Sequence, residues 1–145
     1  GGAIYCAESG PTIKNCVITE NVASWGGAIR YEDGSDTVIE DCLFVNNSAE
    51  GAGAIYYMQS GGKIARCVFR NNYSTWNRAG AVRIRESNVS ITDCIFQGNS
   101  AFLDDSPEGG WGGALAIAEC QVSITNCLFA GNFASKGGAI FTRFS

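Results

Sequence analysis

The sequence contains no histidine among its 145 residues. Histidine is the general base of Ser-His-Asp and Cys-His nucleophile systems and a frequent zinc ligand, so these sites cannot be built from this chain alone. Proline is rare, with 2 residues, and charged residues make up only 17% of the chain. The 46% share of hydrophobic residues is nevertheless enough for a core, which excludes an intrinsically disordered chain.

Positive charge and long apolar runs are also scarce. The chain has 10 Lys and Arg residues against 14 Asp and Glu residues, which gives a net charge of −4. An acidic balance argues against binding to a phosphate backbone, so we expect no nucleic-acid partner. No apolar run approaches the roughly 20 residues that a membrane-spanning helix needs. We therefore expect no membrane span in this segment.

Glycine, in contrast, is abundant, with 19 residues, and it recurs at fixed places. The tetrapeptide Gly-Gly-Ala-Ile or a close variant occurs six times. The last residues of the copies are 25, 26, 27, 33 and 25 positions apart, and they are Ile4, Ile29, Ile55, Val82, Leu115 and Ile140. The chain is therefore a repeat protein with a period of about 26 residues and one insertion.

A second motif follows the first in constant phase. The pattern Ile-x-x-Cys-x-Phe-x-x-Asn occurs five times, with Ile18 in place of Phe in the first copy. Its cysteines, the cysteine column, are Cys16, Cys42, Cys67, Cys94 and Cys127. Its asparagines, the asparagine column, are Asn21, Asn47, Asn72, Asn99 and Asn132. The internal spacing is identical in every copy while the connecting segments vary, so the fold requires these columns.

The repeat predicts an all-β solenoid. A leucine-rich repeat has a similar motif, but it returns through a helical segment, and glycine pairs break helices. Here Ile29 with Tyr31, and Val82 with Ile84, show the period of two that is typical of strands. We therefore predict a right-handed parallel β-helix of about five and a half coils with three short strands per coil.

The whole chain is predicted to be one structural unit. Residues 1–145 form a single β-helix segment, and residues 102–111 form a loop insertion in the fourth coil. Solenoids need polar caps, yet the sequence begins inside one motif and ends just after another. We therefore expect a fragment of a longer solenoid, with neighbouring coils of the longer chain at both ends.

The two columns of the second motif are expected to be structural. The spacing of the cysteine column fits no zinc or redox motif, so we expect small buried hydrophobic side chains. A disulfide between neighbouring coils is the alternative. The asparagine column is expected to form a ladder at a corner of the coil, because an amide donates and accepts hydrogen bonds at once.

The solvent-facing side of the Gly-Gly-Ala-Ile strand is less uniform. The last residues of the Gly-Gly-Ala-Ile copies, Ile4 and its five counterparts, form the apolar column. The residues directly after them are Tyr5, Arg30, Tyr56, Arg83, Ala116 and Phe141, and Arg85 lies two positions after Arg83. Tyrosine and arginine are preferred at recognition surfaces. The candidate ligand-binding residues are therefore Tyr5, Arg30, Tyr56, Arg83 and Arg85. The alternative is that these side chains only stack on one another by cation–π contact.

Other features suggest no catalytic or metal site. Trp25 and Trp111 each precede a glycine pair, and with Trp76 they are expected to line one corner, where they cap turns or stack on sugar rings. The insertion contains three carboxylates, but the spacing of an EF-hand or of a nonapeptide calcium repeat is missing. We expect no metal, no cofactor and no catalytic residue.

The alternation of Gly-Gly-Ala-Ile and Phe-x-x-Asn, as in residues 26–29 and 44–47, resembles the repeats of the chlamydial polymorphic outer membrane proteins and similar bacterial right-handed β-helix surface proteins. The resemblance covers the whole chain in eleven phased copies. It implies an adhesive passenger rod at the cell surface or outside the cell, often delivered as an autotransporter. Its partners would be surface proteins or glycans of a host or neighbouring cell.

The function expected from the sequence is therefore that of a non-enzymatic rod that mediates adhesion, or binds glycan or protein, through an outer strand face. Two alternatives stay open. One is a purely structural spacer or filament segment. The other is a polysaccharide lyase or hydrolase, as in other β-helix proteins. Such an enzyme needs two or three convergent carboxylates, whereas Glu32 and Glu86 lie in different columns two coils apart.

Overall fold

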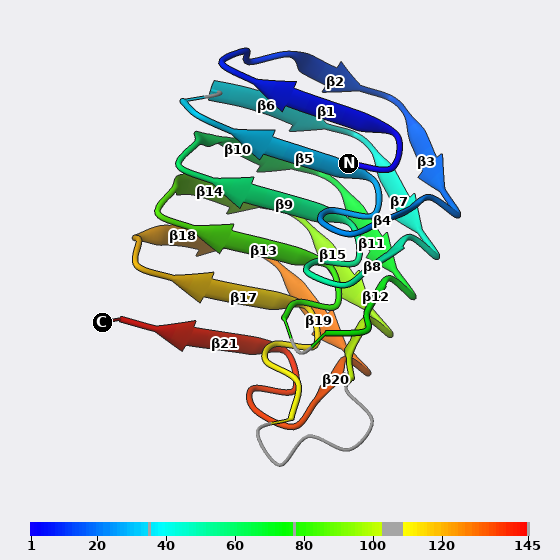
Figure 1. The fold of residues 1–145 in the computed structure, drawn as a ribbon. Helices are drawn as coiled ribbons and strands as arrows, with labels where there is room; N and C mark the ends of the chain where they lie inside the picture. The colour runs from blue at the N-terminus through cyan, green and yellow to red at the C-terminus, as the bar shows by residue number, and fades with distance from the viewer. Residues whose placement is uncertain (35, 77, 103–108, 145) are drawn as a thin grey trace.

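The computed structural model describes residues 1–34, 36–76, 78–102 and 109–144. The chain winds into a rod of stacked coils, in which 21 short strands form four parallel sheets (Figure 1). Each strand pairs in parallel with its counterparts in the neighbouring coils, on both sides except at the ends of the sheets. The predicted all-β parallel β-helix is confirmed. No helix long and apolar enough to cross a membrane occurs among these residues.

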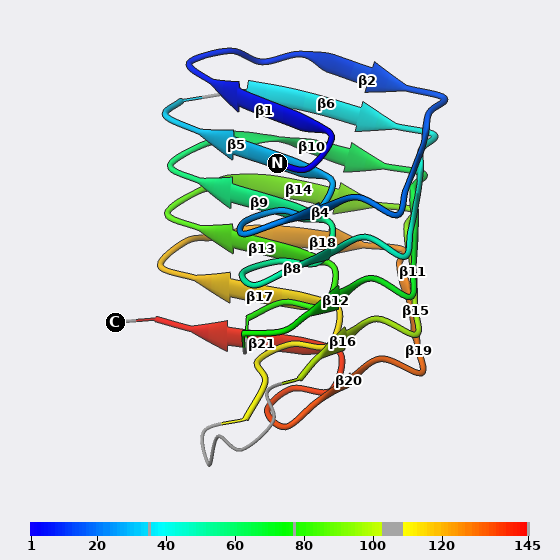
Figure 2. The ribbon, with the colours of Figure 1, turned by 45° about the vertical axis from the view of Figure 1, so that its right-hand side comes forward.

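The first sheet has six strands, which follow the glycine pairs and lie one above another along the rod (Figure 2). They are β1 (Ile4–Ala7), β5 (Ile29–Glu32), β9 (Ile55–Met58), β13 (Val82–Arg85), β17 (Leu115–Ala118) and β21 (Ile140–Arg143). Side chains alternate along each strand, so the apolar column faces the interior and the next residue faces outward.

The second and third sheets have five strands each and flank the cysteine column. The second sheet consists of β2 (Thr12–Lys14), β6 (Asp36–Glu40), β10 (Gly61–Ala65), β14 (Asn88–Thr92) and β18 (Val122–Thr125). The third sheet consists of β3 (Val17–Thr19), β7 (Leu43–Val45), β11 (Val68–Arg70), β15 (Ile95–Gln97) and β19 (Leu128–Ala130). Their apolar and aromatic columns complete the interior.

A fourth sheet follows the asparagine column and was not predicted. Its five strands have two residues each: β4 (Val22–Ala23), β8 (Ser48–Ala49), β12 (Tyr73–Ser74), β16 (Ser100–Ala101) and β20 (Phe133–Ala134). A complete coil therefore has four strands, where the sequence predicted three. Two residues are too few to show an alternating pattern, which is why the sequence gives no signal for these strands.

The register between coils follows the motifs. Ile4 pairs with Ile29, and Phe44 pairs with Phe69. The 33-residue interval keeps the same register, because Val82 pairs with Leu115. The extra residues of that interval therefore fall between β16 and β17 in the sequence. Of the predicted insertion at 102–111, residues 103–108 lie outside the described residues.

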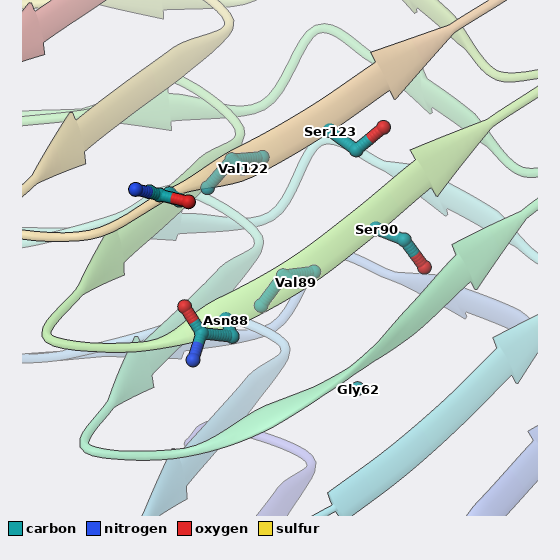
Figure 3. A pocket seen from close by; sticks show the side chains of 7 residues that line it. Gly62, Asn88, Val89, Ser90, Val122 and Ser123 are labelled. Atoms are coloured by element: carbon teal, nitrogen blue, oxygen red, sulfur yellow. The ribbon is translucent and has the colours of Figure 1, made fainter.

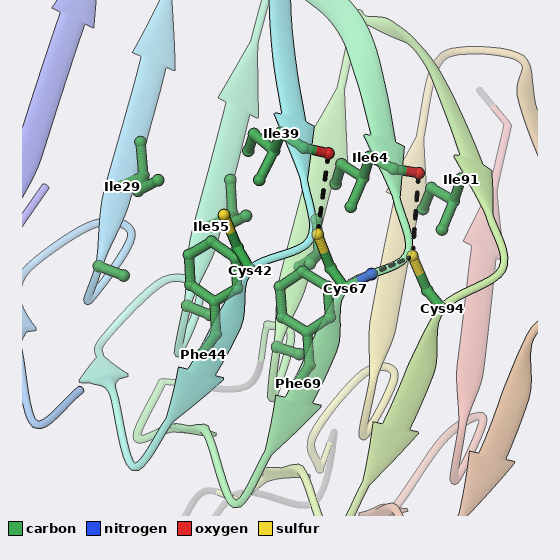
Figure 4. Close-up of a cluster of buried hydrophobic side chains, with 14 of the residues drawn as sticks. Ile29, Ile39, Cys42, Phe44, Ile55, Ile64, Cys67, Phe69, Ile91 and Cys94 are labelled. Atoms are coloured by element: carbon green, nitrogen blue, oxygen red, sulfur yellow. Dashed lines mark hydrogen bonds between the residues drawn. The ribbon is translucent and has the colours of Figure 1, made fainter. Parts of the chain in front are cut away.

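The core is a set of stacks of identical residues (Figure 4). The rings of Phe44, Phe69 and Phe96 stack at centroid distances of 4.8 and 4.7 Å, with interplanar angles of 4° and 3°. These rings are fully buried, as are the isoleucines of the same coils, Ile39, Ile64 and Ile91. Each large side chain buried in this way contributes about 1.5–3 kcal/mol, so the columns stabilise the rod along its whole length.

The cysteine column lies at the corner between the second and third sheets. Cys42, Cys67 and Cys94 are buried, and each Sγ donates to a carbonyl two residues earlier at 3.1–3.2 Å. Sγ of Cys94 also accepts from the backbone N–H of Cys67 at 3.4 Å. All seven cysteines of the chain are free thiols. The buried members of the column therefore act as small side chains that also satisfy backbone groups.

The asparagine column lies at the corner before the fourth sheet. Nδ2 of Asn47 donates to Oδ1 of Asn72 at 3.0 Å, and Nδ2 of Asn72 donates to Oδ1 of Asn99 at 3.0 Å. These three asparagines are fully buried. Each Nδ2 also donates to a phenylalanine or isoleucine carbonyl of the preceding coil, for Asn72 that of Phe44 at 3.0 Å. The amides thus satisfy backbone groups that the turn would otherwise leave unpaired.

Candidate functional site

The outer face of the first sheet is the candidate site (Figure 2). Strand pairing aligns its outward residues in one column, the outer column, which consists of Tyr5, Arg30, Tyr56, Arg83, Ala116 and Phe141. A second outward column, two residues further along each strand, includes Glu32, Arg85 and Arg143. The structure therefore places all five sequence-predicted binding residues on one face. Neighbouring side chains cover these five residues to different degrees.

Tyr5 and Arg30 are both bound to Glu32. The Tyr5 hydroxyl donates to Oε2 of Glu32 at 2.8 Å, and Nε of Arg30 donates to Oε1 at 2.8 Å. The hydrogen bond to Glu32 raises the pKa of Tyr5. Burial would raise the pKa of Glu32, but the bonds from Tyr5 and Arg30 outweigh it and the pKa is lowered. Glu32 is therefore held as a carboxylate by two of the predicted binding residues.

Tyr56 and Arg83 are buried under neighbouring side chains, with 6% and 7% of their surfaces exposed. The Trp25 ring lies 5.2 Å from the Tyr56 ring, and the Arg83 guanidinium lies 5.9 Å from the Trp25 ring and 5.7 Å from the Tyr56 ring. A further guanidinium, that of Arg78, lies 5.3 Å from the Trp25 ring. Arg83 is thus fixed between aromatic rings on the outer face.

Trp25 can cover this part of the face because Gly51 leaves space for it. The residues before successive glycine pairs form a corner column of Trp25, Gly51, Arg78, Trp111 and Lys136. A Cβ at Gly51 would lie 2.0 Å from Cε3 of Trp25, so a side chain there would displace the indole. The tryptophan therefore reaches across the Gly51 coil toward Arg78.

Arg85 lies beside this cluster and has acidic partners. Its Nε lies 3.1 Å from Oε1 of Glu86, and its Nη2 lies 3.7 Å from Oε2 of Glu119. The side chain is 37% exposed. Arg85 is consequently a partly neutralised cation at the edge of the face, in contrast to Arg83.

A second aromatic cluster lies three coils further along. The Trp111 ring stacks on the Phe141 ring at 5.3 Å and 21°, and the Arg143 guanidinium lies 5.9 Å from the Trp111 ring. Between the two clusters the outer column contains only the methyl group of Ala116. The gap forms a small cavity of about 20 Å³, whose wall includes Arg78, Arg83, Trp111, Ala116, Phe141 and Arg143.

Two hydrogen-bond donors at this cavity have no partner. Nη1 of Arg83 and Nε1 of Trp111 are buried and unpaired among the described residues. Burial lowers the pKa of Arg83 to about 10, and repulsion by Arg78 adds to the effect. The guanidinium is still charged at neutral pH, so a desolvated cation and a neutral donor share one site. Such groups are rare in folded proteins because they are costly to bury unpaired.

The second sheet has a larger but shallower depression on its outer face (Figure 3). Its volume is about 600 Å³, and it is lined by Gly62, Asn88, Ser90, Gln121 and Ser123 among others. Gly62 lacks a side chain, and Ser90 and Ser123 lie on the neighbouring strands β14 and β18. The depression has no charged or aromatic lining residue. It follows from small residues in adjacent coils and has no group with unusual chemistry.

Of the three predicted tryptophans, Trp76 is 56% exposed. Trp25 and Trp111 lie on the corner column, and Trp111 is part of the cavity wall. Within the described ranges, no group of three or more Cys, Asp or Glu side chains is placed to hold a metal ion. The acidic residues of the insertion, Asp104, Asp105 and Glu108, lie outside the described residues.

The sequence did not predict two residues of the cavity, Arg78 and Arg143. Arg78 belongs to the corner column, which precedes the strand, so the alternation along the strand does not place it on the face. The sequence did contain a signal for the gap itself. Ala116 is the one small residue in an outer column of tyrosines, arginines and a phenylalanine. A small residue among large ones in a stacked column predicts a local hollow.

Two family models match parts of the chain. One, described as a right-handed beta helix region, matches residues 1–67. The other, described as a Chlamydia polymorphic membrane protein repeat, matches residues 93–118 and 126–143. No curated protein and no solved structure matched the chain. These matches confirm the resemblance and the handedness expected from the motifs. The chain is a right-handed parallel β-helix with repeats like those of Chlamydia polymorphic membrane proteins.

Proposed function

We propose that this chain is part of a non-enzymatic rod at the cell surface or outside the cell, and that it mediates adhesion by binding a protein or glycan through the outer face of its first sheet. The match to a repeat of Chlamydia polymorphic membrane proteins supports the surface location. The interior columns provide the scaffold. The binding residues are the outward ones, Tyr5, Arg30, Tyr56, Arg83 and Arg85, together with the side chains that pack on them.

The observation that carries this proposal is the pair of unpaired donors on the outer face, Arg83 Nη1 and Trp111 Nε1. A buried donor without a partner costs about 1–3 kcal/mol. The asparagine and cysteine columns of the same rod satisfy their polar groups coil after coil. A third unpaired buried atom, Tyr31 Oη, lies in the interior of the rod. The pair on the outer face lies where a binding partner can supply the missing acceptors.

The carboxylates of this face favour binding over catalysis. A general acid needs a raised pKa, whereas burial acting on Glu32 is outweighed by the bonds from Tyr5 and Arg30, which lower its pKa. Glu86 is likewise engaged, with Arg85 at 3.1 Å and with Nε2 of Gln59 at 2.9 Å. Acidic groups held in this way position basic side chains instead of donating protons.

A charge-matched pair of variants tests the proposal. The outer-face variant replaces Arg30, Arg83 and Arg85 with glutamine, and the control variant replaces three basic residues of the second and third sheets, Lys14, Lys63 and Arg70, with glutamine. We expect the outer-face variant to lose binding to glycan arrays and to cells while its β-sheet circular dichroism persists. The control variant should bind like the wild type.

The other outcomes identify the alternatives. Equal binding by both variants, whether retained or lost, would contradict the proposal, because the outer face would then have no effect of its own. No binding by any of the three proteins would favour a structural spacer or filament segment. Release of unsaturated sugars from a polysaccharide would favour a lyase.

A further inference from the structure

The cavity at Ala116 is built by three consecutive coils. Arg83 lies on β13, Ala116 on β17 and Phe141 on β21, and strand pairing puts these three residues in one column. Arg78 and Trp111 close the cavity from the corner column. Any side chain larger than alanine at position 116 would fill the space. The cavity therefore depends on one small residue in an otherwise bulky column.

The hydrogen-bonding groups and charges at this cavity are all of one kind. Three arginines, Arg78, Arg83 and Arg143, line it, and no acidic residue of the described residues does. None of the three is within ion-pair distance of a described acidic residue. The charge of Glu119 raises the pKa of Arg83 slightly against the effect of burial, and its carboxylate lies 3.7 Å from Arg85. The cavity thus offers donors and positive charge, and it lacks an acceptor.

We propose that this cavity binds the carboxylate of an acidic sugar residue, such as a uronate or a sialate. A carboxylate has two oxygens and accepts hydrogen bonds only, so it can take one bond from Arg83 Nη1 and one from Trp111 Nε1. The volume of about 20 Å³ admits about one or two water-sized groups. It therefore fits a two-oxygen group at the end of a larger ligand that remains outside.

The surroundings favour a sugar over an acidic peptide. Trp111 and Phe141 are aromatic residues in the cavity wall, and the C–H face of a pyranose ring packs on such rings while its hydroxyl groups stay in water. A peptide commonly gains affinity by pairing its backbone with a free strand edge. Here β13 and β17 are paired on both sides. Of the strands that line the cavity, only β21 has an edge unpaired among the described residues.

This inference rests on the proposed outer-face binding, but its test is independent of cells and of complex glycans. The indole N–H of Trp111 is observed by two-dimensional ¹H–¹⁵N NMR, and the Trp111→Phe spectrum assigns it among the three tryptophans. Sodium glucuronate and N-acetylneuraminate are the probes. Glucose, acetate and an acidic tetrapeptide are the comparison compounds. We expect a saturable shift of the Trp111 indole signal with the two carboxylated sugars.

Variants of this chain locate the binding site. Ala116→Leu fills the cavity without removing a donor or a charge, and we expect at least about tenfold weaker binding, which corresponds to about 1.4 kcal/mol. Trp111→Phe keeps an aromatic ring on Phe141 but lacks the N–H, and binding followed through backbone amides should also weaken about tenfold. Arg70→Gln, on the third sheet, removes one charge elsewhere and should bind like the wild type.

Each contrary outcome overturns a defined part of this proposal. Unchanged glucuronate binding by Ala116→Leu would overturn the cavity assignment, provided that the well-dispersed spectrum of this variant shows that it is folded. Equal binding of acetate would overturn the sugar component, and preferential binding of the tetrapeptide would transfer the site to a protein partner. If the rod binds cells or neutral glycans while glucuronate causes no shift, this inference fails and the proposed outer-face function stands.

Discussion

The side-chain Nδ2 of Asn72 donates to Oδ1 of Asn99 at 3.0 Å, and the backbone N–H of Asn72 donates to the same oxygen at 3.0 Å. One amide oxygen therefore accepts two hydrogen bonds from the asparagine of the preceding coil. The bond pair repeats between Asn47 and Asn72. It connects consecutive coils outside the strand ladders, so it fixes the register where the chain turns.

Replacement of a central asparagine should therefore be costly. Asn72→Ala removes the acceptor of two bonds from Asn47 and leaves the Phe44 carbonyl without its donor. We expect a loss of about 3 kcal/mol or more in the free energy of unfolding, measured by urea titration. The control is Asn21→Ala, whose Oδ1 accepts no bond from a described residue, and we expect a loss of about 1 kcal/mol. Equal losses would show that the ladder is not cooperative.

The phenylalanine stack should be as sensitive to truncation. Phe69 is fully buried between Phe44 and Phe96, with ring centroids at 4.8 and 4.7 Å. Phe69→Ala leaves a cavity in this stack, and we expect a loss of about 3–5 kcal/mol. Val68→Ala, on the outward side of the same strand, should cost about 1 kcal/mol. A comparable loss for both variants in urea unfolding would contradict the assignment of inward and outward faces.

Some glycines are required by close contact between coils and others by backbone conformation. A Cβ at Gly53 would lie 1.9 Å from the carbonyl oxygen of Gly80, and neither backbone can move without breaking the ladder. We expect Gly53→Ala to lower the free energy of unfolding by about 3 kcal/mol or more. Gly131 has a φ of +61° and open space around its Cβ position, so Gly131→Ala should cost only about 1–2 kcal/mol. Thermal unfolding of both variants distinguishes the two cases.

Stability should depend on pH through Glu40. Hydrogen bonds from Lys14 and Lys63, each at 3.0 Å, lower the pKa of Glu40 to about 2 from its usual 4.5. A carboxyl group with a lowered pKa in the folded state stabilises the fold above its usual pKa and loses that contribution as the pH falls through the lowered value. The contribution is therefore lost between pH 4.5 and about 2.

The matching variant is Glu40→Gln, which cannot ionise. We expect its melting temperature to lie below that of the wild type at about pH 6 and the difference to disappear near pH 2. A difference that stays constant over this range would mean that Glu40 contributes through packing and not through its charge.

The sequence predicted the scaffold well because the scaffold is periodic. Residues such as Phe44, Phe69 and Phe96 recur at fixed phase, and only a coil-on-coil register brings them together. The fourth sheet was missed because two residues such as Ser48 and Ala49 have no recognisable period.

The site was predicted less completely, because alternation tells which side of a strand a residue faces but not what covers it. Tyr56 and Arg83 face outward as expected, yet Trp25 and Arg78 from the corner column bury them. The cavity results from Ala116 and from the corner side chains around it. No single column of the sequence contains all of these residues.

Successive coils lie in register and are joined through the asparagine column, and this register also assembles the outer face. Scalar couplings across hydrogen bonds, measured by long-range NMR on the ¹³C,¹⁵N-labelled protein, test it directly. We expect a coupling from the backbone amide nitrogen of Asn47 to Cγ of Asn72, and another from the backbone amide nitrogen of Asn72 to Cγ of Asn99. Couplings from these amides to any other residue, or rapid hydrogen exchange at both amides, would contradict it.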